Sequence, residues 1–313
     1  ADIENLGGQL VLRRGQPKTV LDALLQETNA DALYWNRRYG GSERAVDTEI
    51  KSYFTARSIE VDSFNGTLLT EPWTVRTGTG SYYKVFTPYW KAVRALYAPP
   101  PPQPRLESLQ ASQKLNTDNL DAWQLHPHKP DWSDGLSSAW RPGEAGAKDR
   151  LGAFLQKGIG FYDRHRNRPD LDHGTSRLSP HLAWGEIAPS TIWRAVQQHI
   201  SAHEADVDGA MVFLSELVWR DFAYVLLFHK PNLAIENYNQ DFDLMPWRAS
   251  ETDLLAWQQG QTGYPIVDAG MRELWTTGWM HNRVRMIVAS FLTKHLLLPW
   301  QHGETRFWDT LVD

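Results

Sequence analysis

Residues 275–286 read WTTGWMHNRVRM and mark the junction between two predicted helices. Apolar residues recur at helical spacing on both sides of this stretch. Gly278 is expected to end the first helix and Asn282 to cap the second, because these residue types favour such positions. A helix N-terminus attracts anions, and an arginine beside a tryptophan suits a phosphate and a stacked base. The stretch therefore predicts a helical fold with an anion or nucleic-acid site around Arg283.

Helical periodicity extends outward from this junction over residues 139–313, which predicts an all-α C-terminal domain. The strongest helical stretches are expected at residues 147–158, 190–203, 210–228, 264–276 and 282–297. Ahead of this domain, residues 99–138 open with PPPPQP and stay polar, so they are expected to form a Pro-rich interdomain linker.

Residues 1–98 alternate short apolar runs with amphipathic stretches. Strands are expected at residues 9–12, 31–35 and 59–64, with helices at 18–27 and 43–57 between them. This β-α-β-α-β order predicts parallel strands joined by right-handed crossovers. We therefore expect an α/β domain with a doubly wound parallel sheet that is incomplete.

Composition narrows the chemistry that the chain can carry. The 313 residues include no cysteine, which excludes disulfides, thiolate metal sites and cysteine nucleophiles, and the histidines show no metal-ligand spacing. The net charge of −5 restricts any nucleic-acid site to a local patch. No apolar run approaches the roughly 18 residues that a membrane span needs, so a cytoplasmic protein is expected. The 15 tryptophans exceed what packing requires, and a row of indoles could conduct electrons.

The stretch GTSRLS at residues 174–179 offers two kinds of hydroxyl, a guanidinium and backbone donors ahead of a helical pattern. These groups suit a pyrophosphate, and the serines and threonine also suit an ordinary helix cap, so both interpretations stay open. His281, by contrast, is expected to be a hydrogen-bonded structural residue.

The stretch SELVWRDF at residues 215–222 places Glu216 and Arg220 four residues apart on one helix face. As an exposed pair they would stabilise the helix by about 0.3–0.5 kcal/mol. The apolar neighbours leave little polar surface, so the alternative is a partly buried pair, which more often marks a functional site.

Four blocks together resemble the DNA photolyase/cryptochrome family: GTSRLS (174–179), ELVWRDF (216–222), GYPIVDA (263–269) and GWMHNRVRM (278–286). Their order and spacing carry the resemblance, which covers nearly the whole chain. It implies an N-terminal α/β antenna domain and a helical domain that holds FAD. The chain lacks the opening Arg-Arg-Asp-Leu-Arg block of the family and stops at Asp313, so we expect a fragment at both ends.

Asn282 and Met286 stand where photolyases for the 6-4 photoproduct and animal cryptochromes resemble one another in carrying histidine. The resemblance therefore points to the class I branch, whose members split cyclobutane pyrimidine dimers as carbon–carbon lyases. It implies a monomeric enzyme in which excited FADH⁻ passes an electron to a dimer flipped out of UV-damaged DNA. The alternatives are a cryptochrome-type blue-light photoreceptor and a non-catalytic fragment that binds FAD and DNA. The antenna chromophore, of folate or deazaflavin type, is left open.

The resemblance also implies site residues. Those expected to hold FAD are Tyr162, Thr175, Ser176, Arg177, Leu178, Ser179, Glu216, Arg220, Asn282, Arg285 and Asp313. Those expected to contact DNA are Arg166, Glu216, Trp219, Asn282, Arg283 and Met286. Catalytic roles would fall to Glu216, Asn282, Trp247 and Trp300, of which the two tryptophans match the distal and middle members of an electron-transfer triad.

Overall fold

The computed structural model describes residues 2–101, 103–104, 106–110 and 114–313. Their contacts divide the chain into two compact units. The α/β unit comprises the described residues of Ala1–Gly66 and Pro100–Ser133, and the helical unit comprises Thr67–Pro99 and Asp134–Asp313. This division differs from the predicted ranges of 1–98, 99–138 and 139–313. The predicted linker also includes residues 102, 105 and 111–113, which lie outside the described residues.

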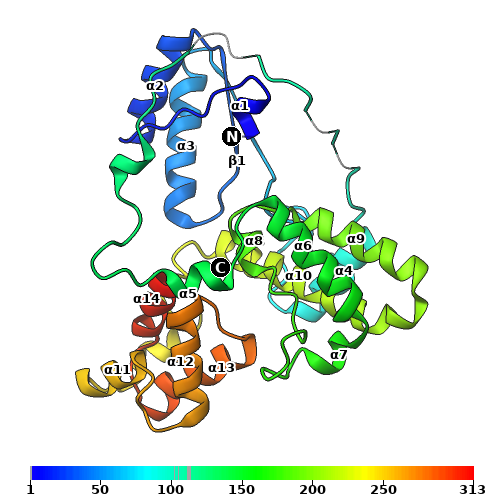
Figure 1. The fold of residues 1–313 in the computed structure, drawn as a ribbon, viewed down its shortest axis with the longest axis vertical. Coiled ribbons are helices and arrows are strands. Elements are labelled where there is room, and N and C mark those ends of the chain that lie inside the picture. Colours follow the sequence, from blue (N-terminus) through cyan, green and yellow to red (C-terminus); the bar gives the residue numbers. More distant parts are fainter. Residues whose placement is uncertain (1, 102, 105, 111–113) are drawn as a thin grey trace. The chain divides into compact units, whose positions relative to one another are not determined.

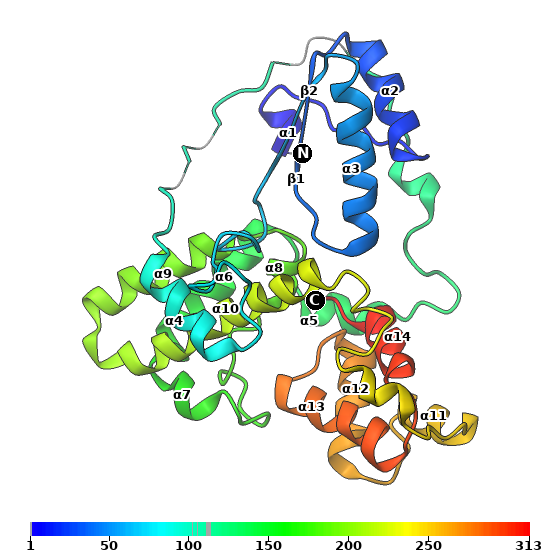
Figure 2. The ribbon, with the colours of Figure 1, turned by 180° about the vertical axis from the view of Figure 1, so that it is seen from behind.

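The α/β unit is built on two parallel strands, β1 (Ala32–Asn36) and β2 (Glu60–Phe64), with Ala32 opposite Glu60 and Asn36 opposite Phe64. The crossover between them is α3 (Gly41–Thr55), and the remaining elements are α1 (Asp2–Asn5), α2 (Pro17–Thr28) and the 3₁₀ turn η1 (Leu120–Trp123). Figure 2 shows the two strands side by side. Ile50 and Phe54 of α3 pack on Val61 of β2 to form the core. The parallel pairing is confirmed.

The predicted strand at residues 9–12 is wrong. This segment runs beside residues 115–118, but side chains make most of the bonds: the Gln9 amide pairs with both backbone groups of Leu115, and the Leu12 N–H donates to the Thr117 hydroxyl. Side-chain bonds take the place of a backbone ladder, so the sheet of the described residues has two strands instead of three.

The helical unit has its hydrophobic residues in two core clusters. Figure 1 shows α4, α6, α9 and α10 gathered together, and α11 to α14 forming a second group. The helices are α4 (Phe86–Leu96), α5 (Asp134–Ala139), α6 (Glu144–Lys157), α7 (Tyr162–His165), α8 (Ser179–Ala183), α9 (Pro189–Ala202), α10 (Val207–His229), α11 (Glu251–Gln258), α12 (Pro265–Thr277), α13 (Asn282–Ser290) and α14 (Trp300–Thr310). Short 3₁₀ turns are η2 (Ile159–Phe161), η3 (Glu204–Asp206) and η4 (Gln240–Leu244), and η5 (Phe291–His295) is a π-helical turn.

Residues 67–99 belong to the helical unit because α10 holds them. The buried carboxylate of Asp221 accepts hydrogen bonds from the backbone N–H groups of Leu69 (3.2 Å) and Thr70 (2.8 Å). The buried Tyr89 of α4 shares a 3.1 Å hydrogen bond with the Thr70 hydroxyl and packs near Phe222 of α10. An apolar helix face and a buried acceptor thus place this segment against α10.

The helix ends within residues 275–286 agree with the prediction only in part. Gly278 ends α12 with φ 66°, and a Cβ there would lie 2.6 Å from the Val312 side chain, so glycine is required twice over. The N-cap of α13 is His281 and not Asn282, because the His281 Nδ1 accepts from the Arg283 N–H at 3.1 Å. No helix of the described residues is both long and apolar enough to span a membrane.

Candidate functional site

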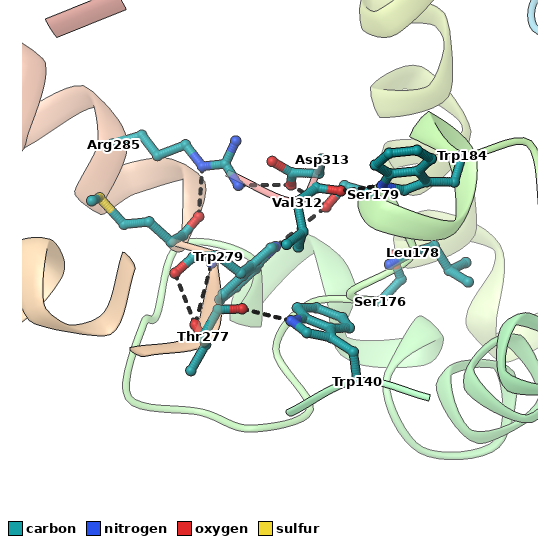
Figure 3. Close-up of polar contacts among 11 residues, drawn as sticks. Trp140, Ser176, Leu178, Ser179, Trp184, Thr277, Trp279, Arg285, Val312 and Asp313 are labelled. Carbon is teal, nitrogen blue, oxygen red and sulfur yellow. Dashed lines mark hydrogen bonds and ion pairs between the residues drawn. The ribbon is translucent and has the colours of Figure 1, made fainter. Parts of the chain in front are cut away.

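Val312 and Asp313 are tied by hydrogen bonds to two parts of the helical unit (Figure 3). The Val312 N–H donates to the Gly278 carbonyl at 2.8 Å, and the Val312 carbonyl accepts from the Trp184 indole at 2.9 Å. The Asp313 carboxylate accepts from the Ser179 hydroxyl and pairs with Arg285 at 2.7 Å. Residues distant in sequence, from α8, the 278–281 turn and α13, therefore converge at Asp313.

A cavity of about 250 Å³ opens at this convergence. It is lined by Tyr162, Thr175, Ser176, Arg177, Leu178, Ser179, Trp279, Met280, Asn282, Arg285 and Asp313. Nine of the eleven residues that were expected to hold FAD are in this lining, whereas Glu216 and Arg220 are not. We call this cavity the polar pocket.

The hydroxyl groups of the GTSRLS stretch do not cap α8. The N-cap of α8 is Leu178 without a side-chain bond, and the Ser176 hydroxyl makes only a 3.4 Å contact with the Leu178 N–H. Ser179 instead bonds to Asp313. The helix-cap interpretation is therefore wrong, and these side chains line the polar pocket instead.

Cations and one carboxylate dominate the electrostatics of the polar pocket. The Arg177 guanidinium lies 4.7 Å from the centre of the Trp279 ring, and the Trp279 indole donates to the Ser179 hydroxyl at 3.2 Å. Asp313 balances Arg285, but its Oδ1 is buried without a hydrogen-bond partner among the described residues. The pocket thus presents an unused acceptor beside two guanidinium groups.

Burial shifts the titration of two groups near the pocket. It lowers the pKa of His281, and the neighbouring arginines lower it further, so the ring is neutral at pH 7 and its Nδ1 can accept the Arg283 N–H. Burial also raises the pKa of Tyr162, followed by the effect of the Glu216 charge, so this phenol stays protonated. His281 has the structural role that the sequence predicted.

A second, larger cavity of about 600 Å³ meets the polar pocket at Asp313. Its lining is mainly apolar and includes Trp300, Phe307 and Trp308 of α14 with Trp184 and Leu292. Hydroxyl groups and arginines are absent from this lining as described. The larger cavity therefore lacks the hydroxyl and guanidinium groups that line the polar pocket.

The predicted pair of Glu216 and Arg220 is wrong. Glu216 pairs with Arg166 at 2.6 Å, and both side chains are about a quarter exposed or less, at 27% and 20%. Arg220 donates to the backbone carbonyls of Thr67 and Leu182. Glu216 therefore pairs with Arg166, which is 50 residues away, and not with Arg220 on its own helix. Arg220 instead holds the chain segment that precedes α4.

The six residues expected to contact DNA, which we call the rim, differ in exposure: Trp219, Asn282 and Met286 are exposed, whereas Arg166, Glu216 and Arg283 are partly buried. Trp219 is 45% exposed, and one face of its indole stacks on Phe86 with ring centres 3.7 Å apart and an angle of 11°. Arg283 donates to the Asn167 side chain at 2.7 Å and lies beside Met286, which is 55% exposed. Asn282 is exposed as well and also lines the polar pocket.

Hydrogen bonds join the chain segment that contains Trp247 to the segment that contains Trp300. The Trp300 indole donates to the Asn237 side chain at 2.6 Å, and Asn237 lies on the same loop as Trp247. The Arg248 N–H donates to the Leu297 carbonyl at 2.8 Å, just ahead of α14. Their expected roles in electron transfer stay predictions.

The sequence places Trp279 at an anion-attracting helix N-terminus, but neither Trp279 nor Met280 is among the residues expected to hold FAD, and both line the polar pocket. Trp279 had a visible signal, because it follows the helix-ending Gly278 and precedes the capping residue. Phe86 and Asn237 gave no such signal, since each acts on a tryptophan far away in the sequence.

The chain is similar to known photolyases and cryptochromes. A family model described as "FAD binding domain of DNA photolyase" matches residues 213–313, and one described as "DNA photolyase" matches residues 1–105. The deoxyribodipyrimidine photo-lyase of Agrobacterium fabrum is 46% identical over 100% of this chain and 65% of its own length. Cryptochrome-2 of Arabidopsis thaliana is 34% identical over 99% of this chain and 52% of its own length.

The crystal structure of a bacterial class III photolyase from Agrobacterium tumefaciens matches with a TM-score of 0.96 and 46% identity, over 99% of this chain and 64% of that one. This neighbour is described as a class III photolyase, whereas the sequence motifs resemble the class I branch. The chain spans slightly less than two thirds of these photolyases.

Proposed function

Because the chain belongs to the DNA photolyase/cryptochrome family, we propose that it functions in light-driven DNA repair and splits cyclobutane pyrimidine dimers in UV-damaged DNA. The reaction class is that of a deoxyribodipyrimidine photo-lyase, a carbon–carbon lyase. We propose further that the protein acts as a monomer in the cytoplasm.

The residues of the polar pocket fit part of an FAD molecule. Hydroxyl groups of Thr175 and Ser176 with the Arg177 guanidinium suit a pyrophosphate, and the unpartnered Asp313 Oδ1 suits a group that donates a hydrogen bond. The cavity of about 250 Å³ is below the ~300–1,000 Å³ of pockets that enclose a drug-sized ligand. These residues would therefore hold one portion of the cofactor, while Glu216 and Arg220 stay proposals as further contacts.

When bound, reduced FAD supplies the excited-state electron that splits the dimer. This chain's own residues would position the damaged bases. Trp219 offers an indole surface against which an extruded base can stack, and Arg283 offers a cation to the flanking phosphate. Arg166 and Met286 extend this rim on either side.

Glu216 would hold a proton for the dimer. Its carboxylate now accepts from Arg166, so contact with a base carbonyl requires Arg166 to turn toward a DNA phosphate. The freed carboxyl, once protonated, can donate a hydrogen bond to the carbonyl oxygen on which negative charge develops. Asn282, which is exposed beside the polar pocket, would complete the contact between cofactor and lesion.

A blue-light photoreceptor of cryptochrome type is the second candidate, and the 34% identity to Cryptochrome-2 of Arabidopsis thaliana supports it. A fragment that binds FAD and DNA without catalysis is the third. An antenna chromophore of folate or deazaflavin type would serve either light-driven function, and neither type is favoured by a described contact.

The observation that carries the proposal is the gathering of nine expected cofactor residues in one pocket. The test loads the full chain with FAD and illuminates it with blue light in the presence of an oligonucleotide that contains one thymine dimer. Restoration of two thymines in the light but not in the dark is expected. FAD binding without repair would favour the photoreceptor or the non-catalytic fragment, and no FAD binding would contradict all three.

A further inference from the structure

We infer that Asn237 is a positioning residue for Trp300: its side chain fixes the Trp300 indole and stabilises positive charge on that ring. This inference rests on the proposed function, because only there does Trp300 carry an electron. Nothing in the sequence motifs or in the names of the relatives assigns Asn237 a role.

A chain of two hydrogen bonds carries the inference. The Trp300 indole N–H donates to the Asn237 Oδ1 at 2.6 Å, and the Asn237 Nδ2 donates to the Asp243 Oδ1 at 2.6 Å. Both distances are at the short end for nitrogen donors. The amide therefore has its oxygen and its nitrogen committed, and its orientation is fixed from both sides.

The loop that supplies Asn237 also carries Trp247. Residues 231–249 connect α10 to α11, and beyond Trp247 the Arg248 N–H donates to the Leu297 carbonyl at 2.8 Å. The Arg248 guanidinium contacts the Leu296 carbonyl at 3.4 Å. The segment around Trp247 is thus fastened to the chain around Trp300 at two places, one of which is the indole itself. Loss of the Asn237 contact would loosen the geometry between the two tryptophans.

The chemistry of an oxidised indole explains why the acceptor matters. An electron passed inward toward the flavin from Trp300, the middle member of the expected triad, and regained from Trp247, leaves a transient positive charge on the Trp300 ring. The charged N–H is a stronger donor, so its bond to the Asn237 oxygen strengthens in that state. The negative charge of Asp243 polarises the amide in the favourable sense. An amide oxygen is too weak a base to remove the proton, so the indole keeps it and can regain its electron without a proton transfer.

The test measures hydrogen exchange of the Trp300 indole N–H by NMR in the chain labelled with ¹⁵N-tryptophan. Absence of the signal from Trp300→Phe assigns it. Asn237→Leu removes the acceptor at similar volume and should speed the exchange about three- to tenfold, the range for one lost hydrogen bond. Asn232→Leu is the matched control, because Asn232 lies on the same loop and its side-chain amide donates to Glu236. Unchanged exchange in Asn237→Leu would overturn the inference.

Two further variants guard against misfolding and separate the two parts of the inference. The double variant Asn237→Asp with Asp243→Asn exchanges the two groups, so it keeps an acceptor oxygen and avoids two facing carboxylates. It should retain slow Trp300 exchange, and fast exchange there would also contradict the proposal. With FAD bound, Asn237→Leu should photoreduce the flavin several-fold more slowly than Asn232→Leu. If Trp300→Phe lowers photoreduction but Asn237→Leu does not, the charge-stabilising role is wrong. If Trp300→Phe has no effect, the proposed electron route fails while the hydrogen-bond result still stands by itself.

Discussion

The polar pocket and the rim use the same residue types in opposite ways. In the polar pocket, Arg285 and Ser179 are tied to a carboxylate whose side chain is only 5% exposed. On the rim, Arg166 and Arg283 bind Glu216 and the Asn167 side chain at the surface. Pocket contacts connect α8 and α13 to Asp313, whereas rim contacts join long side chains that are partly exposed.

This difference indicates which side chains are already in position to bind a ligand. Pocket groups are already held in place, so binding there needs little reordering of side chains. Rim cations must exchange a protein partner for phosphate, so their net contribution to binding is smaller than their charge suggests. We therefore expect pocket variants to change affinity strongly and rim variants to change mainly the salt dependence.

The largest effect should come from Asp221, which anchors the helix that supplies the rim. Asp221→Ala leaves the N–H groups of Leu69 and Thr70 buried without an acceptor. We expect a loss of about 3–5 kcal/mol in the free energy of unfolding, as for other buried networks that lose one partner. Urea denaturation measures it. A loss below about 1 kcal/mol would mean that the segment around Leu69 is held by apolar packing alone.

The same carboxyl predicts how stability depends on pH. Burial raises the pKa of Asp221 to about 7, and the bonds from Leu69 and Thr70 only partly offset this. The unfolded chain would titrate near 3.9, so between roughly pH 4 and 7 the folded state binds more protons. The contribution of this group is therefore largest below about pH 4 and is lost as pH rises through 7. Asp221→Asn should flatten that part of the stability profile, and an unchanged slope would contradict the raised pKa.

Next in size is the effect of Asp313 on the polar pocket. Asp313→Asn removes the charge that balances Arg285 and turns one acceptor oxygen into a donor. We expect FAD affinity to fall about 10- to 100-fold, since a hydrogen bond to a charged group contributes about 1.5–3 kcal/mol. Asp309→Asn, at an exposed position of α14, is the control. Equal affinities in a flavin fluorescence titration would remove Asp313 from the site.

Rim cations should show a smaller effect that depends on salt. Arg283→Ala should weaken DNA binding and reduce the slope of log K against log salt by about 0.9, the value for one phosphate contact. Arg164→Ala is the control, because its side chain is 76% exposed and contacts Asp163. Arg166→Ala tests the exchange of partners: a slope like that of the unaltered chain would show that Arg166 stays with Glu216.

How well the sequence predicts each structural feature depends on how far apart in the sequence the interacting residues lie. The apolar stretch at 210–228 and the helix-ending Gly278 are local signals, and both are confirmed. The GTSRLS stretch was recognised as a block, and the structure places it around one pocket with Asp313. Local patterns and family blocks thus gave the helices and most of the pocket lining.

Interactions between distant residues could not be predicted in the same way. The pairing of Glu216 with Arg166 and of Asp221 with Leu69 depends on tertiary packing, which outweighs the weak helical preference for Arg220. The strand expected at residues 9–12 failed because its neighbours offered side-chain partners in place of a ladder. His281 became the cap of α13 because burial keeps its ring neutral.

The smallest effect, and the finest test of the rim, concerns the stack of Phe86 on Trp219. Phe86 covers one face of an indole that is otherwise 45% exposed, with an angle of 11° between the rings. Phe86→Leu keeps an apolar contact but loses the stack, which contributes about 0.5–1.5 kcal/mol. If Trp219 receives the extruded dimer, the variant should bind a dimer-containing duplex about 2- to 10-fold more weakly while its affinity for undamaged duplex stays the same.

Phe242→Leu, at an exposed position of η4, controls for loss of a phenyl ring. The ¹⁵N-labelled indole signal of Trp219, assigned by its absence from Trp219→Phe, should report a more mobile Trp219 in Phe86→Leu only. Equal discrimination between the two duplexes would mean that the stack serves packing of α4 on α10, and the rim would then read backbone charge without holding the lesion.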